Sequence, residues 1–247
     1  MLKKTIKIIE IKKEITNLCR IKILPAKKEV ENIRIAGVGI RHKNKRQQED
    51  LQMSVVMAVK QGDRIWFGAD TQATRGGDRY NQLSPNDYKV TMFDNGVLLS
   101  ATGETVTSQI LLAHPEWFTV DEEKGLTKKH IVTKIIPRIY EVLREEELLE
   151  QDDKGTPPIM KCTVLLAYED KLFEICRDLQ VIRYEDYQAT GSGSNAVNYG
   201  LSRIDKSKDI NEQLLRLLRI SAKHDTNVSA PFIFIDTKDL KFTVKEG

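Results

Sequence analysis

From residue 54 onward, short apolar runs rich in β-branched residues alternate with turn residues, a pattern that predicts β-hairpins. The first hairpin joins residues 54–60 to residues 64–73 through Gln-Gly-Asp. The second joins residues 89–93 to residues 97–103 through Asp-Asn-Gly, and its Asn-Gly pair suits the positive φ angles of a tight hairpin turn. Two further hairpins are expected over residues 162–178 and 231–244, and one further strand over residues 181–191.

Four stretches carry the helical spacing of apolar residues. In the longest, residues 127–150, the apolar positions that approximate this spacing are Ile131, Ile135, Tyr140 and Leu143. Pro137 lies inside this stretch and predicts a kink, because proline cannot donate a backbone hydrogen bond. The other helical stretches are residues 104–118, 194–204 and 210–224, and a polar loop is expected over residues 151–158.

The expected order is four strands, two helices, about three strands, two helices and two strands. Antiparallel hairpins dominate this order, which excludes an alternating βαβ chain with a parallel sheet. Two sheets packed face to face, with a helix pair on each outer face, would bury every apolar stripe. The sequence therefore predicts an α+β fold, a four-layer αββα sandwich, over residues 53–247, whereas residues 1–52 add no such pattern.

The composition is that of a soluble globular protein, with 40% apolar and 30% charged residues in a chain of 247. No apolar run is long enough to span a bilayer, and the basic N-terminus lacks the continuous apolar core of a secretory signal. We therefore expect a cytoplasmic protein with no membrane contact. Reduced thiols and no metal or other cofactor are expected, because the cysteines and histidines show no ligand spacing. These dispersed residues are Cys19, Cys162, Cys176, His42, His114, His130 and His224.

Charge is distributed unevenly along the chain. Residues 1–52 carry 14 Lys and Arg against 6 Asp and Glu, whereas residues 53–247 carry 25 against 30. A basic arm that binds nucleic acid is one interpretation of this asymmetry. The arm lacks the aromatic residues of a base-stacking surface, so we favour the interpretation that it lies outside the folded unit, is poorly ordered and binds no nucleic acid.

The glycine-rich stretch GSGSNAVNYG, residues 191–200, allows two interpretations. Glycines between a strand and a helix can approach a phosphate, which would indicate a nucleotide site. A dinucleotide fingerprint, however, needs a parallel βαβ unit, and Ala196 stands where its third glycine belongs. The other interpretation is a tight turn from a strand into a helix, with Ser192 or Ser194 as the helix cap.

Five short features follow one another in a specific order, and they are Ser54, Gly68-Ala69-Asp70, Lys89, Ala101-Thr102-Gly103 and Gly191-Ser192-Gly193. Together they resemble the N-terminal-nucleophile hydrolases, specifically the proteasome β-subunit family and its bacterial member of the HslV type. Asp70 lies sixteen positions after Ser54, and Gly103 lies fourteen after Lys89, as in the family pattern. Taken singly, Asp70 could cap a turn, and Lys89 could be a surface lysine.

The resemblance implies a chemical role for each of these residues. Ser54 stands in the place of the N-terminal threonine nucleophile, whose own free α-amine is the base. Lys89 places a cation beside the hydroxyl and the amine, and Asp70 pairs with this buried ammonium. The backbone N–H of Gly103 donates to the oxyanion, and Ser192 orients the α-amine.

Asp225 is expected to support the Ser192 end of this network. The chain departs from the family pattern here, because Val228 stands three positions after Asp225 where the family has a serine. The nucleophile is also a serine rather than a threonine, so the γ-methyl group that helps to fix the rotamer is missing. A serine hydroxyl remains competent for the chemistry.

The resemblance also places a substrate pocket around Ala73, Asp87 and Ala101. Ala101 at its base leaves room, and Asp87 adds negative charge to its wall. Large side chains should therefore be accepted, with basic or polar ones tolerated. The chain carries three more residues between Asp70 and Lys89 than the HslV-type pattern, which alters the loop on the substrate side.

Ser54 is internal in this sequence, and an amide nitrogen has no usable basicity. Residues 1–53 could be a propeptide that the protein removes itself. Alternatively, synthesis starts at Met53, and excision of this methionine exposes Ser54. We favour the internal start, because self-cleaving relatives usually have glycine where Met53 stands, and because codons for Gln48-Glu49-Asp50 can contain the ribosome-binding sequence AGGAGG.

The sequence thus predicts a proteasome-like peptidase of the threonine-type endopeptidase class, with polypeptide substrates. The resemblance implies stacked homo-oligomeric rings and an ATPase unfoldase as a partner. A small-molecule amidase on the same fold and a catalytically silent assembly protein are the alternatives.

Overall fold

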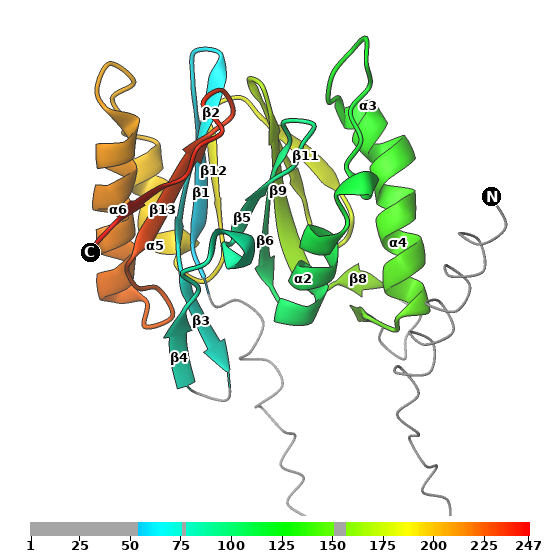
Figure 1. Cartoon of the computed structure of the whole chain (residues 1–247), viewed down its shortest axis with the longest axis horizontal. Helices are drawn as coiled ribbons and strands as arrows, with labels where there is room; N and C mark the ends of the chain where they lie inside the picture. The colour runs from blue at the N-terminus through cyan, green and yellow to red at the C-terminus, as the bar shows by residue number, and fades with distance from the viewer. Residues whose placement is uncertain (1–53, 76–77, 151–156) are drawn as a thin grey trace, which may run out of the picture. The chain divides into compact units, whose positions relative to one another are not determined.

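The computed structural model describes residues 54–75, 78–150 and 157–247. In Figure 1 these residues form four layers, with two β-sheets in the middle and helices on both outer faces. This arrangement confirms the αββα sandwich expected from the sequence. The expected boundary after residue 52, the expected poor order of residues 1–52 and most of the loop at 151–158 lie outside the described residues.

Each central sheet has five antiparallel strands. The first sheet has the order β12 (Tyr187–Thr190), β1 (Val56–Gln61), β2 (Arg64–Asp70), β13 (Phe232–Asp236) and β14 (Thr243–Lys245). The second has the order β11 (Val181–Tyr184), β10 (Lys171–Ile175), β9 (Cys162–Tyr168), β6 (Leu98–Gly103) and β5 (Val90–Met92). Two small hairpins are formed by β3 (Gln72–Arg75) with β4 (Asp78–Asn81) and by β7 (Leu149–Glu150) with β8 (Ile159–Met160).

Helices cover the outer face of each sheet (Figure 1). The first sheet is covered by α5 (Ser194–Leu201) and α6 (Ile210–His224), and α6 begins at Asp209, whose side chain accepts a hydrogen bond from the backbone N–H of Glu212. The second sheet is covered by α2 (Thr105–Ala113), η3 (Pro115–Trp117), α3 (Lys128–His130), the π-helical turn η4 (Ile131–Ile135) and α4 (Ile136–Glu145).

Strand β1 shows why the run after Ser54 is continuously apolar rather than alternating. Val55, Met57 and Val59 pack with α5 and α6, whereas Val56 and Ala58 point the other way and pack between the two sheets. A strand buried on both faces needs apolar residues at every position. The four layers accordingly contain three apolar cores, one between the sheets and one under each helical layer.

Residues 128–145 are helical without a gap, as expected, but they are not α-helical throughout. The π-helical turn η4 comes directly before Pro137, which occupies the first turn of α4. The wider π-helical turn accommodates the proline ring and the missing N–H at this point. The buried residues of α4 are Ile139 and the expected Leu143, whereas Tyr140, also expected, is only partly buried. The helix ends at Glu145, earlier than expected.

Residues 181–191 form two strands rather than one. Strand β11 pairs with β10 in the second sheet, and β12 pairs with β1 in the first sheet. The chain crosses between the sheets at Glu185 and Asp186, which are both exposed. The pattern of apolar residues does not show to which sheet a strand belongs. For this reason the sequence predicted one strand where the structure has two.

The turn of the second hairpin also differs in detail from the expected one. Gly96 has a positive φ of 82°, but Asn95 is not among the residues with positive φ. The Gly96 N–H donates to the Phe93 carbonyl at 2.9 Å. A type I turn followed by a left-handed glycine is the next most common way to close a hairpin, and it matches this geometry. The Asn95 side chain instead donates to the carbonyl of Phe118 at 2.9 Å.

The hairpin of β3 and β4 was not expected from the sequence, which continued the second strand through residue 73. Strand β2 ends at Asp70, and the chain leaves the sheet at the buried Thr71, whose hydroxyl donates to the Pro231 carbonyl at 2.9 Å. The hairpin then projects beyond the first sheet (Figure 1). The break at Thr71 places Asp70 at the rim of the sheet, where it can take part in a site.

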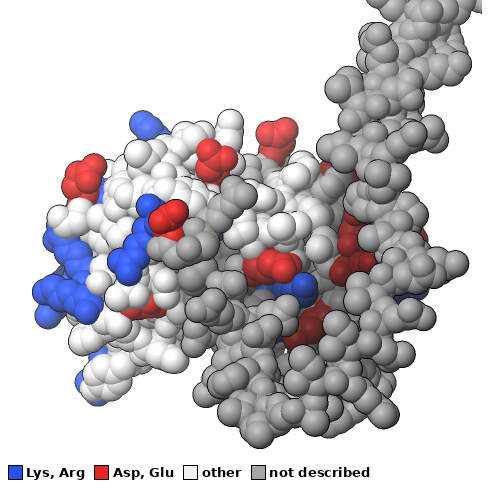
Figure 2. All heavy atoms as spheres, turned by 90° about the horizontal axis from the view of Figure 1, so that it is seen from below, with Lys and Arg blue, Asp and Glu red and all other residues white. Residues whose placement is uncertain are grey.

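The described surface carries charges of both signs. On the face seen in Figure 2, basic side chains gather mainly at the edge on the side of α6, and acidic ones are spread over the remainder. Several pairs join distant parts of the chain, such as Lys60 with Asp170 at 2.7 Å. None of the described helices has the length and apolar character required to cross a membrane.

Candidate active site

Ser54 lies two positions before β1, at the end of the β1–β2 pair that is far from the hairpin turn. Val56 is paired with Ala69 in the register of β1 and β2, which brings Asp70 beside Val55. The Val55 N–H donates to the Asp70 carboxylate at 2.9 Å, and the Asp70 N–H donates to the Val55 carbonyl at 3.3 Å. The Asp70 side chain therefore lies next to Ser54 because of strand register.

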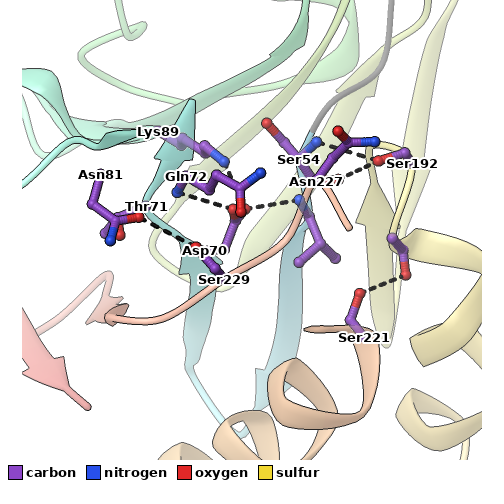
Figure 3. Close-up of polar contacts among 12 residues, drawn as sticks. Ser54, Asp70, Thr71, Gln72, Asn81, Lys89, Ser192, Ser221, Asn227 and Ser229 are labelled. Atoms are coloured by element: carbon purple, nitrogen blue, oxygen red, sulfur yellow. Dashed lines mark hydrogen bonds and ion pairs between the residues drawn. The ribbon is translucent and has the colours of Figure 1, made fainter. Parts of the chain in front are cut away.

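Asp70 and Lys89 form a buried ion pair next to Ser54 (Figure 3). The ammonium of Lys89 is 2.7 Å from Oδ1 of Asp70, and the two residues are 8% and 0% exposed. Oδ2 of Asp70 accepts a hydrogen bond from the Gln72 N–H at 3.1 Å. Figure 3 shows Lys89 and Ser54 above the same carboxylate. Lys89 is therefore not a surface lysine, and Asp70 does more than cap a turn.

Burial dominates the titration of this pair. It raises the pKa of the Asp70 carboxyl, and the ion pair with Lys89 and the two backbone N–H donors act in the opposite direction. Burial likewise lowers the pKa of the Lys89 ammonium, while the carboxylates of Asp70 and, more weakly, Asp225 favour its charged form. Each partner thus depends on the other to remain ionised.

The turn at residues 191–193 holds Ser54 from the other side. The Ser54 N–H donates to the Ser192 hydroxyl at 3.4 Å, and the Gly193 N–H donates to the Ser54 carbonyl at 3.1 Å. Gly191 has a φ of +94°, and a Cβ atom there would lie 2.2 Å from the Ser54 carbonyl oxygen. Ser54 therefore occupies the space beside these glycines, and they do not form a phosphate cradle. Ser192 does not cap α5, whose N-cap residue is Gly193.

Gly103 ends β6 in a conformation that only glycine adopts readily. Its φ is +138°, and a Cβ atom would lie 2.4 Å from the Lys161 carbonyl oxygen. Gly103 lines a pocket of about 620 Å³ together with Ser54 and Lys89. The expected substrate-pocket residues Ala73, Asp87 and Ala101 line the same pocket. One wall comes from α2, and another comes from the 3₁₀ turn η2 (Pro85–Asp87).

Asp225 lies at the C-terminal end of α6, where its N–H donates to the Ser221 carbonyl at 2.8 Å. Its Oδ1 accepts a hydrogen bond from the Asn227 N–H at 2.8 Å. Its Oδ2 is buried and, within the described residues, has no hydrogen-bond partner. Asp225 does not line the large pocket, but its charge reaches Lys89.

Two residues near Ser54 were not anticipated from the sequence. Gln72 is buried, and besides the contact of its N–H with Asp70, its side chain donates to the Thr226 carbonyl at 3.0 Å. Ser221 is fully buried in α6, and its hydroxyl donates to the Gly193 carbonyl at 3.2 Å. In the sequence, the one signal for Ser221 is that a polar residue stands on the apolar face of a predicted helix. No feature of the sequence distinguishes Gln72.

Among the described residues, no three His, Cys, Asp or Glu side chains are grouped so that they could hold a metal ion. The pocket brings together a hydroxyl, a buried ammonium and a left-handed glycine backbone, a set suited to acyl transfer.

The four layers are those of the proteasome-like fold. Among solved structures, the chain is similar to Thiobacillus denitrificans BPH, with a TM-score of 0.58 and 21% identity over 74% of this chain and 96% of that chain.

It is also similar to Anbu, the ancestral beta-subunit, from Yersinia bercovieri, with a TM-score of 0.58 and 13% identity over 77% of this chain and 86% of that chain. A third similar structure is eukaryotic HslV from Trypanosoma brucei, with a TM-score of 0.52 and 15% identity over 74% of this chain and 98% of that chain. No family model matches the chain, and no curated protein matches it. At these identities the likeness shows the fold, and the chemistry rests on the residues described above.

Proposed function

We propose that this chain is a proteasome-like peptidase that cleaves peptide bonds with Ser54 as its N-terminal nucleophile. The observation that carries the proposal is the place of Ser54, at the wall of a large pocket that Lys89, the buried ion-pair partner of Asp70, also lines. The contact of its backbone nitrogen with the Ser192 hydroxyl adds support, because a free amine at this atom would be held in place.

In the proposed reaction, the Ser54 hydroxyl attacks the carbonyl carbon of the substrate and gives its proton to its own α-amine, whose ordinary pKa is about 7.7–8.0. The Lys89 ammonium stabilises the negative charge that develops on the oxygen. The Gly103 N–H is assigned to the oxyanion of the tetrahedral intermediate. When the intermediate collapses, the C–N bond breaks, and the protonated α-amine returns the proton to the leaving amine.

The resulting ester between Ser54 and the acyl part of the substrate is then hydrolysed. Water attacks the ester carbonyl, the α-amine removes its proton, and the Ser54 hydroxyl leaves with that proton. Asp70 keeps Lys89 charged throughout, since it offers the ammonium a carboxylate at 2.7 Å. Ser192 orients the amine, and Asp225 is assigned to the same end of the network.

This mechanism requires Ser54 to be the first residue of the mature protein. An amide nitrogen is not basic, so a chain that continues on the N-terminal side of Ser54 lacks the base. Removal of a propeptide and a start at Met53 followed by methionine excision both satisfy the requirement, and we favour the second. Similarity to HslV also leads us to propose stacked homo-oligomeric rings in the cytoplasm, served by an ATPase partner.

Cleavage of a fluorogenic peptide tests the proposal. Protein that begins at Ser54 should release the fluorophore, whereas its Ser54→Ala variant and an otherwise identical protein with an N-acetylated Ser54 should not. Epoxomicin, which the structure of the similar BPH contains, is a suitable probe for the same comparison. Equal cleavage by the Ser54→Ala variant would exclude Ser54 as the nucleophile.

A further inference from the structure

The backbone of Ser54 is held by a turn that is itself held from below. Figure 3 shows the chain of contacts, from Ser221 in α6 to the turn before α5 and from that turn to Ser54. The Ser221 hydroxyl donates to the Gly193 carbonyl at 3.2 Å. The Gly193 N–H donates to the Ser54 carbonyl at 3.1 Å. A single residue, Gly193, thus bonds to Ser221 through one peptide group and to Ser54 through the other.

Ser221 is unusual among the residues of its helix face. It is 0% exposed and lies within the apolar layer that contains Leu218 and Val228. A buried hydroxyl is costly unless it is hydrogen-bonded, and an alanine here would complete the apolar stripe of α6. The Ser221 hydroxyl donates to the Gly193 carbonyl. This hydrogen bond to the turn explains why a serine stands at a position that is otherwise suited to an apolar residue.

The contact between α6 and the turn is tight. A Cβ atom on Gly193 would lie 2.3 Å from the Ser221 hydroxyl oxygen and 3.0 Å from the Cβ of Val55. Glycine is therefore required at this position by the packing. Glycine also has the least restricted backbone of all residues, so the direction of its N–H is set by external contacts. The Ser221 hydrogen bond supplies one such contact, and the start of α5 supplies another.

We propose that Ser221 is a positioning residue for Ser54, acting through the two peptide groups of Gly193. This inference rests on the proposed function, since it concerns the geometry of the proposed nucleophile. Ser221 does not touch the substrate pocket, and it acts on the reaction by fixing where the Ser54 backbone lies. The same turn carries Ser192, so Ser221 also sets the position of the hydroxyl that contacts the Ser54 nitrogen.

The test compares acylation of protein that begins at Ser54 with that of its Ser221→Ala variant, using an electrophilic peptide probe. The maximal acylation rate should fall about tenfold in Ser221→Ala, because misplacement of a reacting group costs rate. The probe concentration at half-saturation should change little, since the pocket is intact. The pH at which the rate is half-maximal should shift, because Ser192 moves with the turn. Ser221→Cys, which keeps a weak donor of similar size, should have an intermediate rate.

Ile210→Val is the matched control for loss of stability. Ile210 is 2% exposed and begins the same helix at the end far from the turn, so this variant weakens the α6 packing without touching Gly193. It should keep the wild-type acylation rate and pH profile. If Ser221→Ala also keeps both, Ser221 has no positioning role, and the proposed nucleophile is unaffected by that result.

A second measurement decides the inference even if the wild-type protein proves unreactive, an outcome that would overturn the proposed function instead. Hydrogen exchange of the Gly193 amide reports directly on its bond to the Ser54 carbonyl. In Ser221→Ala this amide should exchange about tenfold faster or more, while the amides of Ile210→Val at the same turn stay protected. Unchanged protection of Gly193 in Ser221→Ala would overturn the inference.

Discussion

The buried charge of Lys89 can promote the proposed reaction, but burying it also costs free energy of folding. Its ammonium is paired with Asp70, Lys89 lines the same pocket as Ser54, and burial lowers its pKa. A cation in this place stabilises an alkoxide-like oxygen and disfavours protonation of a neighbouring amine. The same cation is needed by Asp70, which is completely buried. Substitution of Lys89 should therefore affect both activity and stability, by separate routes.

Lys89→Ala should reduce acylation of the Ser54-started protein by roughly 10²-fold, in line with the loss of an activating group. Lys89→Arg should not restore the rate, because a planar guanidinium does not fit the space of a buried ammonium. Single-turnover labelling with an electrophilic peptide probe measures both variants. A rate within a few-fold of wild type in Lys89→Ala would remove this residue from the mechanism.

The stability of Lys89→Ala should depend on pH in a defined direction. Without its partner, Asp70 is a buried carboxyl whose pKa in the folded state is raised above that in the unfolded chain. The folded state then binds a proton more tightly than the unfolded state does, so stability is retained at low pH and lost as the pH rises through the folded-state pKa. The free energy of unfolding should be larger at pH 5 than at pH 8.

Urea denaturation at the two pH values measures this difference. The double variant Asp70→Asn/Lys89→Ala is the control, because its amide does not titrate and should remove the additional loss of stability at pH 8. A Lys89→Ala protein that is equally stable, or more stable, at pH 8 would show that Asp70 does not carry an unpaired charge there.

At the scale of elements, the sequence predicted the strand pairs that position the site residues. It did not predict the crossing between the sheets or the contact of α6 with the turn before α5. Asp70 reaches Ser54 through the register of β1 and β2, which follows from a hairpin that the sequence marks clearly. The crossing from β11 to β12 was missed, because apolar alternation identifies strands but does not assign them to a sheet. Ser221 was missed because its role comes from a tertiary contact with a turn 28 residues away.

The turn before α5 offers a prediction with a matched control. Gly191→Ala should abolish detectable acylation, since the new Cβ would collide with the Ser54 carbonyl and since φ is +94°. Gly62 also has a positive φ, +62°, but nothing lies within 4 Å of the corresponding Cβ position. Gly62→Ala should therefore cost about 1 kcal/mol of stability from backbone strain alone and should leave acylation unchanged. If Gly191→Ala and Gly62→Ala are acylated at the same rate, the turn before α5 does not position Ser54.

At the scale of the whole molecule, the two sheets bring together residues that are far apart in the chain. Ser54 leads into β1 and Asp70 ends β2 in the first sheet, whereas Gly103 and Ala101 belong to β6 in the second. Ser54, Gly103 and Ala101 line the large pocket together. The αββα layers were predictable from hairpin order and apolar stripes. The hairpin of β3 and β4 was not, although it supplies Gln72 and Ala73 to the pocket.

The pocket leads to a prediction about substrates. Ala101 lines it with a small side chain that leaves space, and Asp87 is the one acidic side chain among the described lining residues. Large residues before the cleaved bond should be accepted, and basic ones should be tolerated better than acidic ones. Profiling with a fluorogenic peptide library measures this preference, and Asp87→Asn should weaken any preference for basic residues. A strict requirement for acidic residues would contradict the assignment of this pocket.

The central claim is that Ser54 acts only when its own amine is free. The most direct test is intact-mass analysis of probe-treated protein, with the site of attachment mapped, for the full-length chain and for a form that begins Met53-Ser54. The short form should lose its methionine and gain one probe at Ser54, and the full-length chain should react only after cleavage between Met53 and Ser54. Labelling of the uncleaved full-length chain at the same rate, together with labelling of the Ser54→Ala variant, would contradict the account.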